Sequence, residues 1–374
     1  MIYLDYAAAT PVDPKVTKKM LPFFKEKFAN PSSIYQFAQK GRGSIENARA
    51  EIAKIIGCLS EEIYFTAGGT EANNWAIFGI ANATQKKHII STALEHHSVL
   101  HPLRELARRG YQVTYLNVDR FGKIKLEDLE KAITKDTFLI TIMYGQNEIG
   151  TIENIEAIGK IARNAGVYFH ADACQAAGQE NINVRDLQVD LMTLNAGKVY
   201  GPKGVGCLYI KKNLKITPLI YGGGQEHRLR GGTENVAGIV GFAEALKIAE
   251  NLRKKEKVRL TKLRDILING IIKDISDSQL NGDPKQRLAN NVNISFKNVS
   301  GESLLLRLDL EGICVSTGAA CSAGTLEPSH VLLGIGLPKD LASGIRLTLG
   351  RHTTPKEIKT VLKKLPEIIK DLRK

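Results

Sequence analysis

The stretch that decides the fold is Val167-Tyr168-Phe169-His170-Ala171-Asp172, together with Asp190-Leu191-Met192-Thr193-Leu194-Asn195-Ala196-Gly197-Lys198. Each stretch is a short apolar run that ends in polar residues, which is typical of buried strands in a parallel sheet. In an open α/β sheet, such strand ends deliver reactive side chains into one crevice. The two runs therefore predict that Asp172 and Lys198 face each other across a single site.

The surrounding sequence alternates between strand and helix patterns. We predict strands at 63–66, 88–93, 112–117, 137–143, 167–171, 190–194 and 206–210. The intervening helices are expected at 44–56, up to Ala81, and at 97–109, 126–133 and 155–165. This rhythm indicates an α/β fold whose large domain holds a mostly parallel seven-stranded sheet with helices on both faces.

The last hundred residues have a different character. After a long helix expected at about 236–274, strands are predicted at 290–296, near 313–316 and at 344–348, with helices at 301–309 and at the C-terminus. These elements indicate a smaller α+β domain. We predict a large domain over 15–255 and a small domain formed by 1–14 and 256–374.

Composition sets the broad class of the protein. The 374 residues are 43% hydrophobic and 24% charged, as in a soluble globular protein. The net charge of +13 raises the question of nucleic acid, but the 52 Lys and Arg are scattered and form no basic block interleaved with aromatic residues. We therefore expect a solvated lysine-rich surface, which could dock an acidic protein, and no nucleic-acid partner.

The sequence also indicates a cytoplasmic location. It shows no signal peptide and no apolar run long enough to span a bilayer, so no membrane association is expected. The five cysteines form no C-x-x-C pair and are odd in number, which favours reduced thiols over a disulfide framework. No metal site is expected.

A lysine opposed to an aspartate suits pyridoxal 5'-phosphate. The lysine can bind the cofactor's aldehyde as a Schiff base, while the aspartate keeps the pyridine nitrogen protonated so that the ring accepts electrons. Gly68, Gly69 and Thr70 lie where a predicted strand turns into a helix, and such a turn offers N–H groups and a helix dipole to a phosphate. Alone, this turn would be an ordinary glycine-rich connection; beside Lys198 we prefer the phosphate interpretation.

Two further residues stand out by their surroundings. Cys321 lies in a run of small residues, 317–325, which is typical of a mobile loop and gives the thiol little packing value. Arg346 lies inside a predicted strand, where a guanidinium needs a partner. That partner is either a structural carboxylate or the carboxylate of an amino-acid substrate.

Several motifs occur in a fixed order along essentially the whole chain. They are residues 3–11, 30–33, 65–71, 95–96, 147–150, 222–226 with 230–233, 316–321 and 346–351, besides the Asp172 and Lys198 segments. In this order they resemble the cysteine desulfurases of the NifS and IscS kind, within the class V aminotransferase branch of the fold-type I pyridoxal-phosphate enzymes. The same analogy suggests that the N-terminal segment packs against the small domain.

The resemblance implies a role for each matching residue. The catalytic residues would be Lys198, Cys321 and His96, with the His96 ring stacked on the cofactor. The cofactor would be held by Gly69, Thr70, His96, Asn147, Asp172, Gln175, Asn195, Lys198 and Thr233. Thr233 would reach the phosphate of a neighbouring subunit, which implies a homodimer. Arg346 would bind the substrate carboxylate, with Asn30 as a second contact.

One departure from the family pattern concerns the lysine motif. The family usually has Ser-x-His-Lys, whereas this chain has Asn195-Ala196-Gly197-Lys198. The usual Ser and His help to hold the phosphate. The sequence therefore predicts either weaker phosphate binding or another donor in their place.

The implied activity is the conversion of L-cysteine to L-alanine, with the sulfur passed to Cys321 as a persulfide. A protein acceptor, such as an iron–sulfur scaffold or a tRNA-thiolation enzyme, would then take the sulfur. The alternatives are a selenocysteine lyase, a class V aminotransferase, or a non-catalytic scaffold of a sulfur pathway. An aminotransferase would not need a thiol at position 321, and a scaffold would not bind the cofactor.

Overall fold

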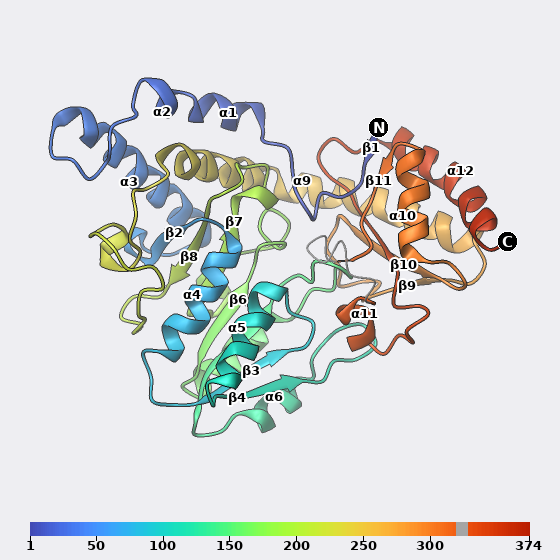
Figure 1. Ribbon diagram of the computed structural model, residues 1–374, viewed down its shortest axis with the longest axis horizontal. Coiled ribbons are helices and arrows are strands. Elements are labelled where there is room, and N and C mark those ends of the chain that lie inside the picture. Colours follow the sequence, from blue (N-terminus) through green and yellow to red (C-terminus); the bar gives the residue numbers. More distant parts are fainter. Residues whose placement is uncertain (319–327) are drawn as a thin grey trace.

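The larger sheet of the molecule contains seven strands in the order β2-β8-β7-β6-β5-β3-β4 (Figure 1). The computed structural model describes residues 1–318 and 328–374. The strands are β2 (Ile63–Thr66), β3 (His88–Thr92), β4 (Gln112–Leu116), β5 (Thr137–Met143), β6 (Tyr168–Asp172), β7 (Leu191–Asn195) and β8 (Gly206–Ile210). Strands β3 to β7 run parallel, whereas β8 is antiparallel to both neighbours. The predicted mostly parallel seven-stranded sheet is confirmed.

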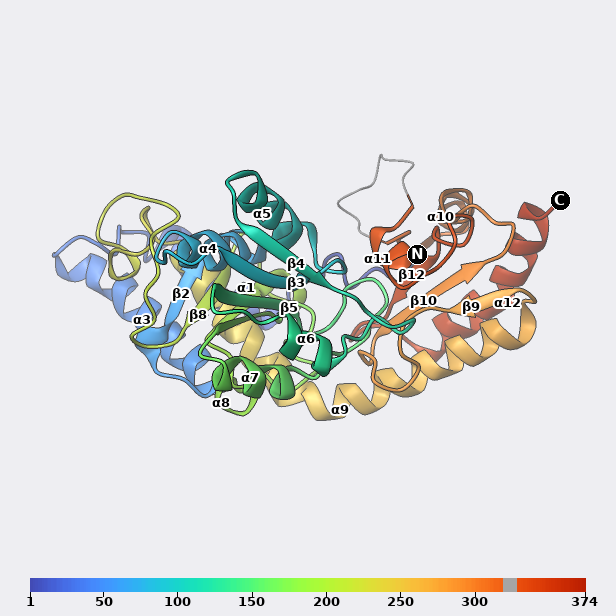
Figure 2. The same ribbon diagram turned by 90° about the horizontal axis from the view of Figure 1, so that it is seen from below.

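Helices cover both faces of this sheet (Figure 2). One face packs against α1 (Pro14–Met20), α3 (Gln36–Ile56), α6 (Leu126–Ala132), α7 (Ile155–Asn164) and the first part of α9 (Val236–Asp274). The other face packs against α4 (Gly69–Ala81) and α5 (His97–Arg108). Neighbouring residues of β7 divide between the two cores: Leu191 lies in one and Met192 in the other. Both faces of the sheet are thus buried, which explains why the strands are almost continuously apolar.

A second, smaller sheet lies at the other end of the molecule. It is antiparallel, in the order β12-β10-β9, and consists of β9 (Ser278–Leu280), β10 (Asn291–Phe296) and β12 (Ile345–Thr348). Helices α10 (Gly301–Leu310) and α12 (Pro355–Leu372) share its core, and the short α11 (His330–Gly334) lies beside it. This sheet, together with its helices, is the expected α+β region.

The N-terminal segment belongs to this second region. Strand β1 (Ile2–Tyr3) pairs in parallel with β11 (Ile313–Cys314), and Leu4 is buried in the core of the smaller sheet. The expected packing of the N-terminus against this region is therefore confirmed. The two separate cores support the domain limits 15–255 and 1–14 with 256–374, which we keep as a proposal.

Helix α9 connects the two regions without a break. Its 39 residues correspond to a length of about 60 Å. Residues 239–249 contribute to the core of the large sheet, and residues 260–271 to the core of the small one. The remaining short elements are α2 (Pro22–Lys25), α8 (Val184–Leu187), η1 (Ser60–Glu62), η2 (Ala196–Lys198) and η3 (Glu226–Arg228).

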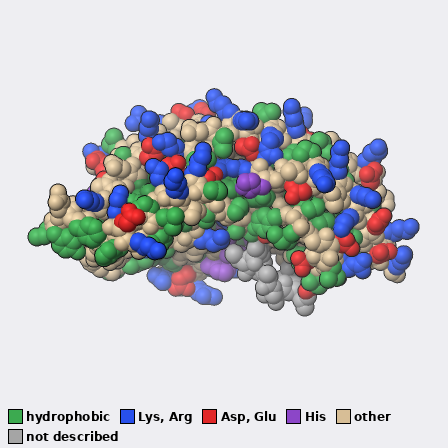
Figure 3. Space-filling model, turned by 90° about the horizontal axis from the view of Figure 1, so that it is seen from above, with side chains coloured by type: hydrophobic (Ala, Val, Ile, Leu, Met, Phe, Trp, Pro, Cys, Tyr) green, Lys and Arg blue, Asp and Glu red, His purple; other side chains and the backbone are tan. Residues whose placement is uncertain are grey.

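The surface carries dispersed charge. On the face shown in Figure 3, Lys and Arg side chains are spread over the molecule instead of gathering into one block. Within the described ranges, no helix is both long and apolar enough to cross a membrane.

Candidate active site

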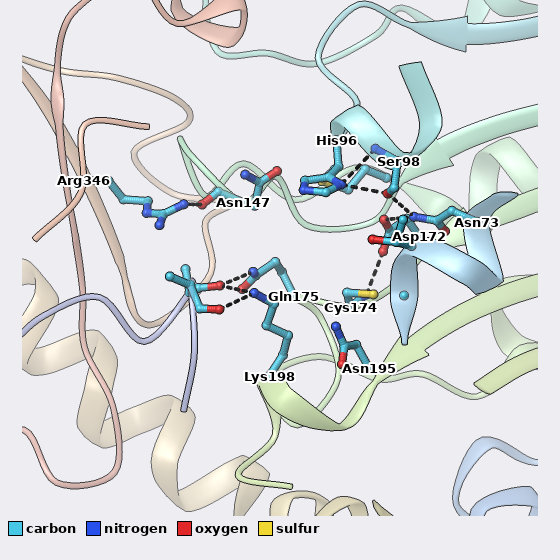
Figure 4. A pocket seen from close by; sticks show the side chains of 15 residues that line it. Asn73, His96, Ser98, Asn147, Asp172, Cys174, Gln175, Asn195, Lys198 and Arg346 are labelled. Atoms are coloured by element: carbon cyan, nitrogen blue, oxygen red, sulfur yellow. Dashed lines mark hydrogen bonds between the residues drawn. The ribbon is translucent and has the colours of Figure 1, made fainter. Parts of the chain in front are cut away.

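The carboxyl ends of the central strands converge on one cavity (Figure 4). Strand β6 ends at Asp172, β7 ends at Asn195 just before Lys198, and α4 begins at Gly69. The cavity encloses about 190 Å³. The expected site residues that line it are Gly69, Thr70, His96, Asn147, Asp172, Gln175, Asn195, Lys198 and Arg346. The structure therefore brings together expected site residues that lie far apart in the sequence, from Gly69 to Arg346.

Asp172 is the buried anchor of this cavity. One carboxylate oxygen accepts a hydrogen bond from Asn73 Nδ2 at 2.7 Å, and the other accepts one from the Cys174 backbone N–H at 3.0 Å. The Asn73 amide also donates to Ser98 Oγ at 2.9 Å, and that hydroxyl lies 2.7 Å from His96 Nδ1. A continuous polar chain therefore connects Asp172 to His96.

His96 directly precedes α5 and is the N-cap residue of this helix. Its pKa lies below the ordinary value, chiefly because burial disfavours the charged ring, and Lys198 adds to this effect while Asp172 opposes it. The ring is therefore mostly neutral at neutral pH and is suited to stacking or to accepting a proton.

Sequence reasoning missed Asn73 and Ser98. Asn73 lies one turn after Thr70 in α4 and therefore faces the same side of the helix, a spacing that could have revealed it. Ser98 lies two residues after His96, within reach of its ring, but no pattern in the sequence distinguishes it.

Lys198 is held at the N-terminal segment. Its Nζ donates hydrogen bonds to the carbonyl oxygens of Ala7 and Ala8, at 2.7 and 2.6 Å. Gln175 Nε2 also donates to the Ala7 carbonyl, at 2.9 Å. The backbone at residues 7–8 thus forms one wall of the cavity. The motif at residues 3–11 pointed to this segment, but not to its contact with Lys198.

Arg346 reaches the cavity from β12. Its Nη2 pairs with Asp5 Oδ1 at 2.8 Å, and its Nη1 donates to the Asn147 carbonyl at 3.1 Å. The Nε group is buried and has no hydrogen-bond partner among the described residues, and the same is true of Asn147 Oδ1. The structure therefore contains the salt bridge that we considered as an alternative for Arg346, and it also leaves a donor for a ligand.

A second hollow, of about 590 Å³, adjoins the first at the start of α4. It is lined by Gly68, Thr70, Asn195, Gly197 and Lys203, among others. Asn195 Oδ1 accepts a hydrogen bond from the Gly197 N–H at 3.1 Å, so the Asn195 amide N–H groups remain as donors. A Cβ at Gly197 would make only ordinary contacts, the nearest at 3.7 Å, so packing does not exclude a side chain there. Besides Lys198, Lys203 lines this hollow, and its cation could replace the usual histidine.

These features fit pyridoxal 5'-phosphate. The N-terminus of α4 offers N–H groups to a phosphate, Asp172 offers a carboxylate to the ring nitrogen, and Lys198 offers the amine. Gly69 lies close to Cys174, and a Cβ at this position would come within 2.8 Å of its Sγ. A larger residue here would therefore fill part of the space open to a phosphate. The unpaired Asn147 Oδ1 is a buried polar atom that still needs a partner.

Not all expected residues meet in this cavity. Asn30 is exposed and caps the turn at Ser32 N–H at 2.9 Å, so the single chain gives no support to its expected substrate contact. Thr233 is exposed and also lies outside the cavity lining, although its expected role was toward a neighbouring subunit. Cys321 lies outside the described residues.

Two of the described thiols, Cys174 and Cys58, are poor candidates for the nucleophile. Cys174 lines the cavity, but burial and the nearby Asp172 raise its pKa well above the usual value. Burial raises the pKa of Cys58 to about 12. A thiol with such a pKa carries little thiolate at neutral pH. In the ranges that the structure describes, no group of three or more His, Cys, Asp or Glu could hold a metal ion.

Known proteins resemble this chain along nearly its whole length. The family model of the class-V aminotransferases matches residues 2–361. The chain is 54% identical to a cysteine desulfurase IscS of Dictyoglomus turgidum, over 100% of this chain and 95% of the relative. It is 48% identical to the IscS of Methanosarcina thermophila, over 100% of this chain and 93% of that relative.

Solved structures show the same likeness. A NifS-like protein superposes with a TM-score of 0.93 at 36% identity, covering 99% of both chains. A structure described as SspA in complex with cysteine superposes with a TM-score of 0.83 at 36% identity, covering 95% of this chain and 100% of that one. The chain therefore belongs to the class V aminotransferase family, within the group of the IscS cysteine desulfurases.

Proposed function

We propose that this chain is a cysteine desulfurase that converts L-cysteine to L-alanine and passes the sulfur to Cys321 as a persulfide. The observation that carries the proposal is that Asp172, Lys198 and Arg346 line one cavity. The relatives named cysteine desulfurase, and the similar protein described in complex with cysteine, support this reaction and this substrate. No described feature of the site favours a selenocysteine lyase, an aminotransferase or a non-catalytic scaffold.

The proposed cofactor is pyridoxal 5'-phosphate. Gly69, Thr70 and Asn195 would hold its phosphate, Asp172 and His96 would hold its ring, and Asn147 and Gln175 would contact the ring edge. When bound, it supplies an aldehyde that captures the substrate amine and a ring that accepts the electrons released at Cα.

The protein groups divide the remaining work. Arg346, with a buried Nε donor that has no partner among the described residues, binds the substrate carboxylate next to Asp5. Lys198 Nζ takes the proton from the substrate Cα and returns it to the product. The two carbonyls at Ala7 and Ala8 accept hydrogen bonds from this Nζ and so fix its position. The thiolate of Cys321 attacks the substrate Sγ: an S–S bond forms, the Cβ–Sγ bond breaks, and its electron pair stays on the three-carbon fragment, which takes up a proton to become alanine.

A homodimer is part of the proposal. Several apolar side chains on α2 and the following connection are highly exposed in the single chain: Phe24 is 61% exposed, Phe28 68% and Ile34 95%. Monomeric proteins rarely leave such side chains grouped on the surface. A second copy that covers them is consistent with the expected position of Thr233 at the neighbouring phosphate.

The destination of the sulfur and the location of the protein also remain proposals. We infer a protein acceptor, such as an iron–sulfur scaffold or a tRNA-thiolation enzyme, in the cytoplasm. The dispersed Lys and Arg side chains support docking of an acidic protein and give no support to a nucleic-acid partner (Figure 3).

The test is the formation of alanine from L-cysteine by the purified protein loaded with cofactor, in the presence of a reducing thiol. We expect alanine and sulfide in equal amounts, and loss of both in Cys321→Ser. No alanine from the loaded wild-type protein would contradict the proposal. A faster reaction with L-selenocysteine that persists in Cys321→Ser would favour the lyase.

A further inference from the structure

Glu148 is a buried carboxylate that the proposed reaction does not use. It directly follows Asn147, and its side chain is 1% exposed. Its backbone is fixed independently of the side chain, because the Glu148 carbonyl accepts hydrogen bonds from Asn291 and Asn293 of β10, at 3.0 and 3.2 Å. The side chain is therefore aimed by a rigid backbone.

The Glu148 carboxylate contacts the C-terminal flank of residues 319–327. Ser329 Oγ donates a hydrogen bond to Glu148 Oε2 at 2.6 Å. The same hydroxyl accepts a hydrogen bond from the Leu332 N–H and so caps α11. The next residue, His330, lies with its Nε2 3.1 Å from the Glu95 carbonyl, beside His96. The start of α11 is therefore attached to both loops that carry cofactor residues.

The same carboxylate lies against the N-terminal flank. A Cβ built on Gly318 would come within 2.8 Å of Glu148 Oε2 and 3.7 Å of Ser329 Cβ. Gly318 also has a φ of +124°, which side chains rarely adopt. Only glycine allows this close approach, so one oxygen atom lies between the two flanks.

Arg346 completes the surroundings of Glu148. Burial raises the pKa of Glu148, while the hydrogen bond from Ser329 and the charges of His330 and Arg346 lower it. The backbone of Arg346 pairs with Ser316, through N–H to O bonds of 3.1 and 2.6 Å. The residue proposed to bind the substrate therefore acts on the Glu148 carboxylate through its charge.

We propose that Glu148 is a positioning residue: its carboxylate binds Ser329 and lies against Gly318, and thereby holds the residues on either side of the segment that contains Cys321 in place relative to Asn147 and Arg346. This role rests on the proposed function, because it matters only if Cys321 must meet a substrate held by Arg346. It concerns the sulfur-transfer step and leaves the removal of the Cα proton by Lys198 unaffected.

The test separates these two steps in the cofactor-loaded enzyme. Exchange of the Cα proton of L-alanine in D₂O, followed by NMR, reports Lys198 without a need for Cys321. Persulfide on the Cys321 peptide, followed by mass spectrometry within one turnover, reports sulfur transfer. We expect Glu148→Gln to lower the persulfide rate about tenfold, as for the loss of one charge-assisted hydrogen bond, and to leave the exchange rate within about twofold.

Matched variants make the outcome decisive. Glu153→Gln changes a second carboxylate with limited exposure, which accepts a hydrogen bond from Ile124 N–H outside the cavity, and should alter neither rate. Ser329→Ala should lower the persulfide rate as much as Glu148→Gln does, whereas Ser329→Thr should keep the wild-type rate. The double variant Glu148→Gln with Ser329→Ala should form persulfide no more slowly than either single variant. Equal losses of exchange and persulfide, or no loss of either, would overturn the positioning role. Absence of alanine from the wild type would instead contradict the proposed function.

Discussion

The two halves of the cavity are built in different ways. The sheet half consists of Asp172 with Asn73, Ser98 and His96, which come from β6 and the first turns of α4 and α5. The joint half consists of Arg346 with Asp5 and Asn147, and Arg346 and Asp5 are 341 positions apart. One sheet preorganises the first half, whereas the second half exists only while two regions and the N-terminus stay packed together.

This contrast suggests a division of labour. Groups fixed by one sheet hold their geometry before any ligand binds, which is what electrostatic stabilisation of a transition state requires. Groups assembled from distant segments are suited to recognising a ligand that completes their contacts. We therefore expect changes in the sheet half to affect turnover and changes in the joint half to affect substrate affinity.

The largest effect on turnover is expected for Asp172→Asn. The substitution keeps the shape and the contact with Asn73 but removes the charge that would face the ring nitrogen. We expect kcat for alanine formation to fall about 10²- to 10³-fold, with KM for L-cysteine changed only slightly. Asp190→Asn is the matched control, since that carboxylate also lies at a strand of the same sheet but pairs with Lys211 at the surface. A selective rise in KM would contradict the division of labour.

Arg346→Lys tests the joint half. A lysine keeps the positive charge, but its ammonium group lacks the planar fork of donors that lets arginine bind Asp5, the Asn147 carbonyl and a ligand carboxylate at the same time. We expect KM for L-cysteine to rise about 10- to 100-fold while kcat falls much less, measured as steady-state alanine formation. Arg264→Lys changes a buried arginine of α9 that binds the carbonyls of Arg287 and Leu288, and it should leave KM unchanged.

Asn73→Ala should have a smaller effect. The substitution removes the hydrogen bonds to Asp172 and Ser98, so the polar chain to His96 is broken. We expect the free energy of unfolding to fall by about 1 to 2 kcal/mol and kcat to fall about tenfold or less. Urea denaturation measures the first quantity and alanine formation the second. The neighbouring variant Asn74→Ala, which loses mainly a bond to the Thr70 carbonyl, should preserve kcat.

Glu95→Gln should have the smallest effect on turnover but a clear effect on pH dependence. Burial raises the pKa of Glu95 from 4.5 to about 8. A raised folded-state pKa contributes stability below the ordinary pKa, and this contribution is lost as pH rises through the folded-state value. Between pH 4.5 and 8, the unfolding free energy should therefore fall less steeply in the variant than in the wild type. Identical slopes in urea denaturation across this range would refute the prediction.

In the sheet half, Asp172 was predictable from sequence because it ends a periodic strand, whereas Asn73 and Ser98 lie on helices and were missed. Apolar runs ending in Asp172 and Lys198 predict both the strands and their meeting point. The joint half was not predictable in this way, because nothing near Asp5 or Arg346 in the sequence shows that they pair. Only the order of motifs along the whole chain suggested that residues 3–11 and 346–351 belong to one site.

Errors in the expected elements have a similar cause. Helix α3 begins at Gln36 and not at 44, because Ala38 and Gly41 pack into the protein although residues 36–43 lack a clear apolar period. Strand β9 was not expected, since its three residues form a strand only through pairing with β10. The strand near 313–316 is limited to Ile313–Cys314, where it pairs with β1. Pairing and packing between distant segments set these boundaries, and the local sequence carries no signal for such contacts.

The number of residues in helix α9 sets the distance and the orientation between the two regions that form the active site. One inserted residue within an α-helix shifts everything after it by about 1.5 Å and rotates it by about 100° around the axis. Because α9 passes from one core to the other without interruption, an insertion near its middle would turn the small sheet, and Arg346 with it, away from Lys198. Connecting loops in most enzymes tolerate such changes in length. Here the number of residues in a helix far from Lys198 would set the position of the residue that we propose to bind the substrate.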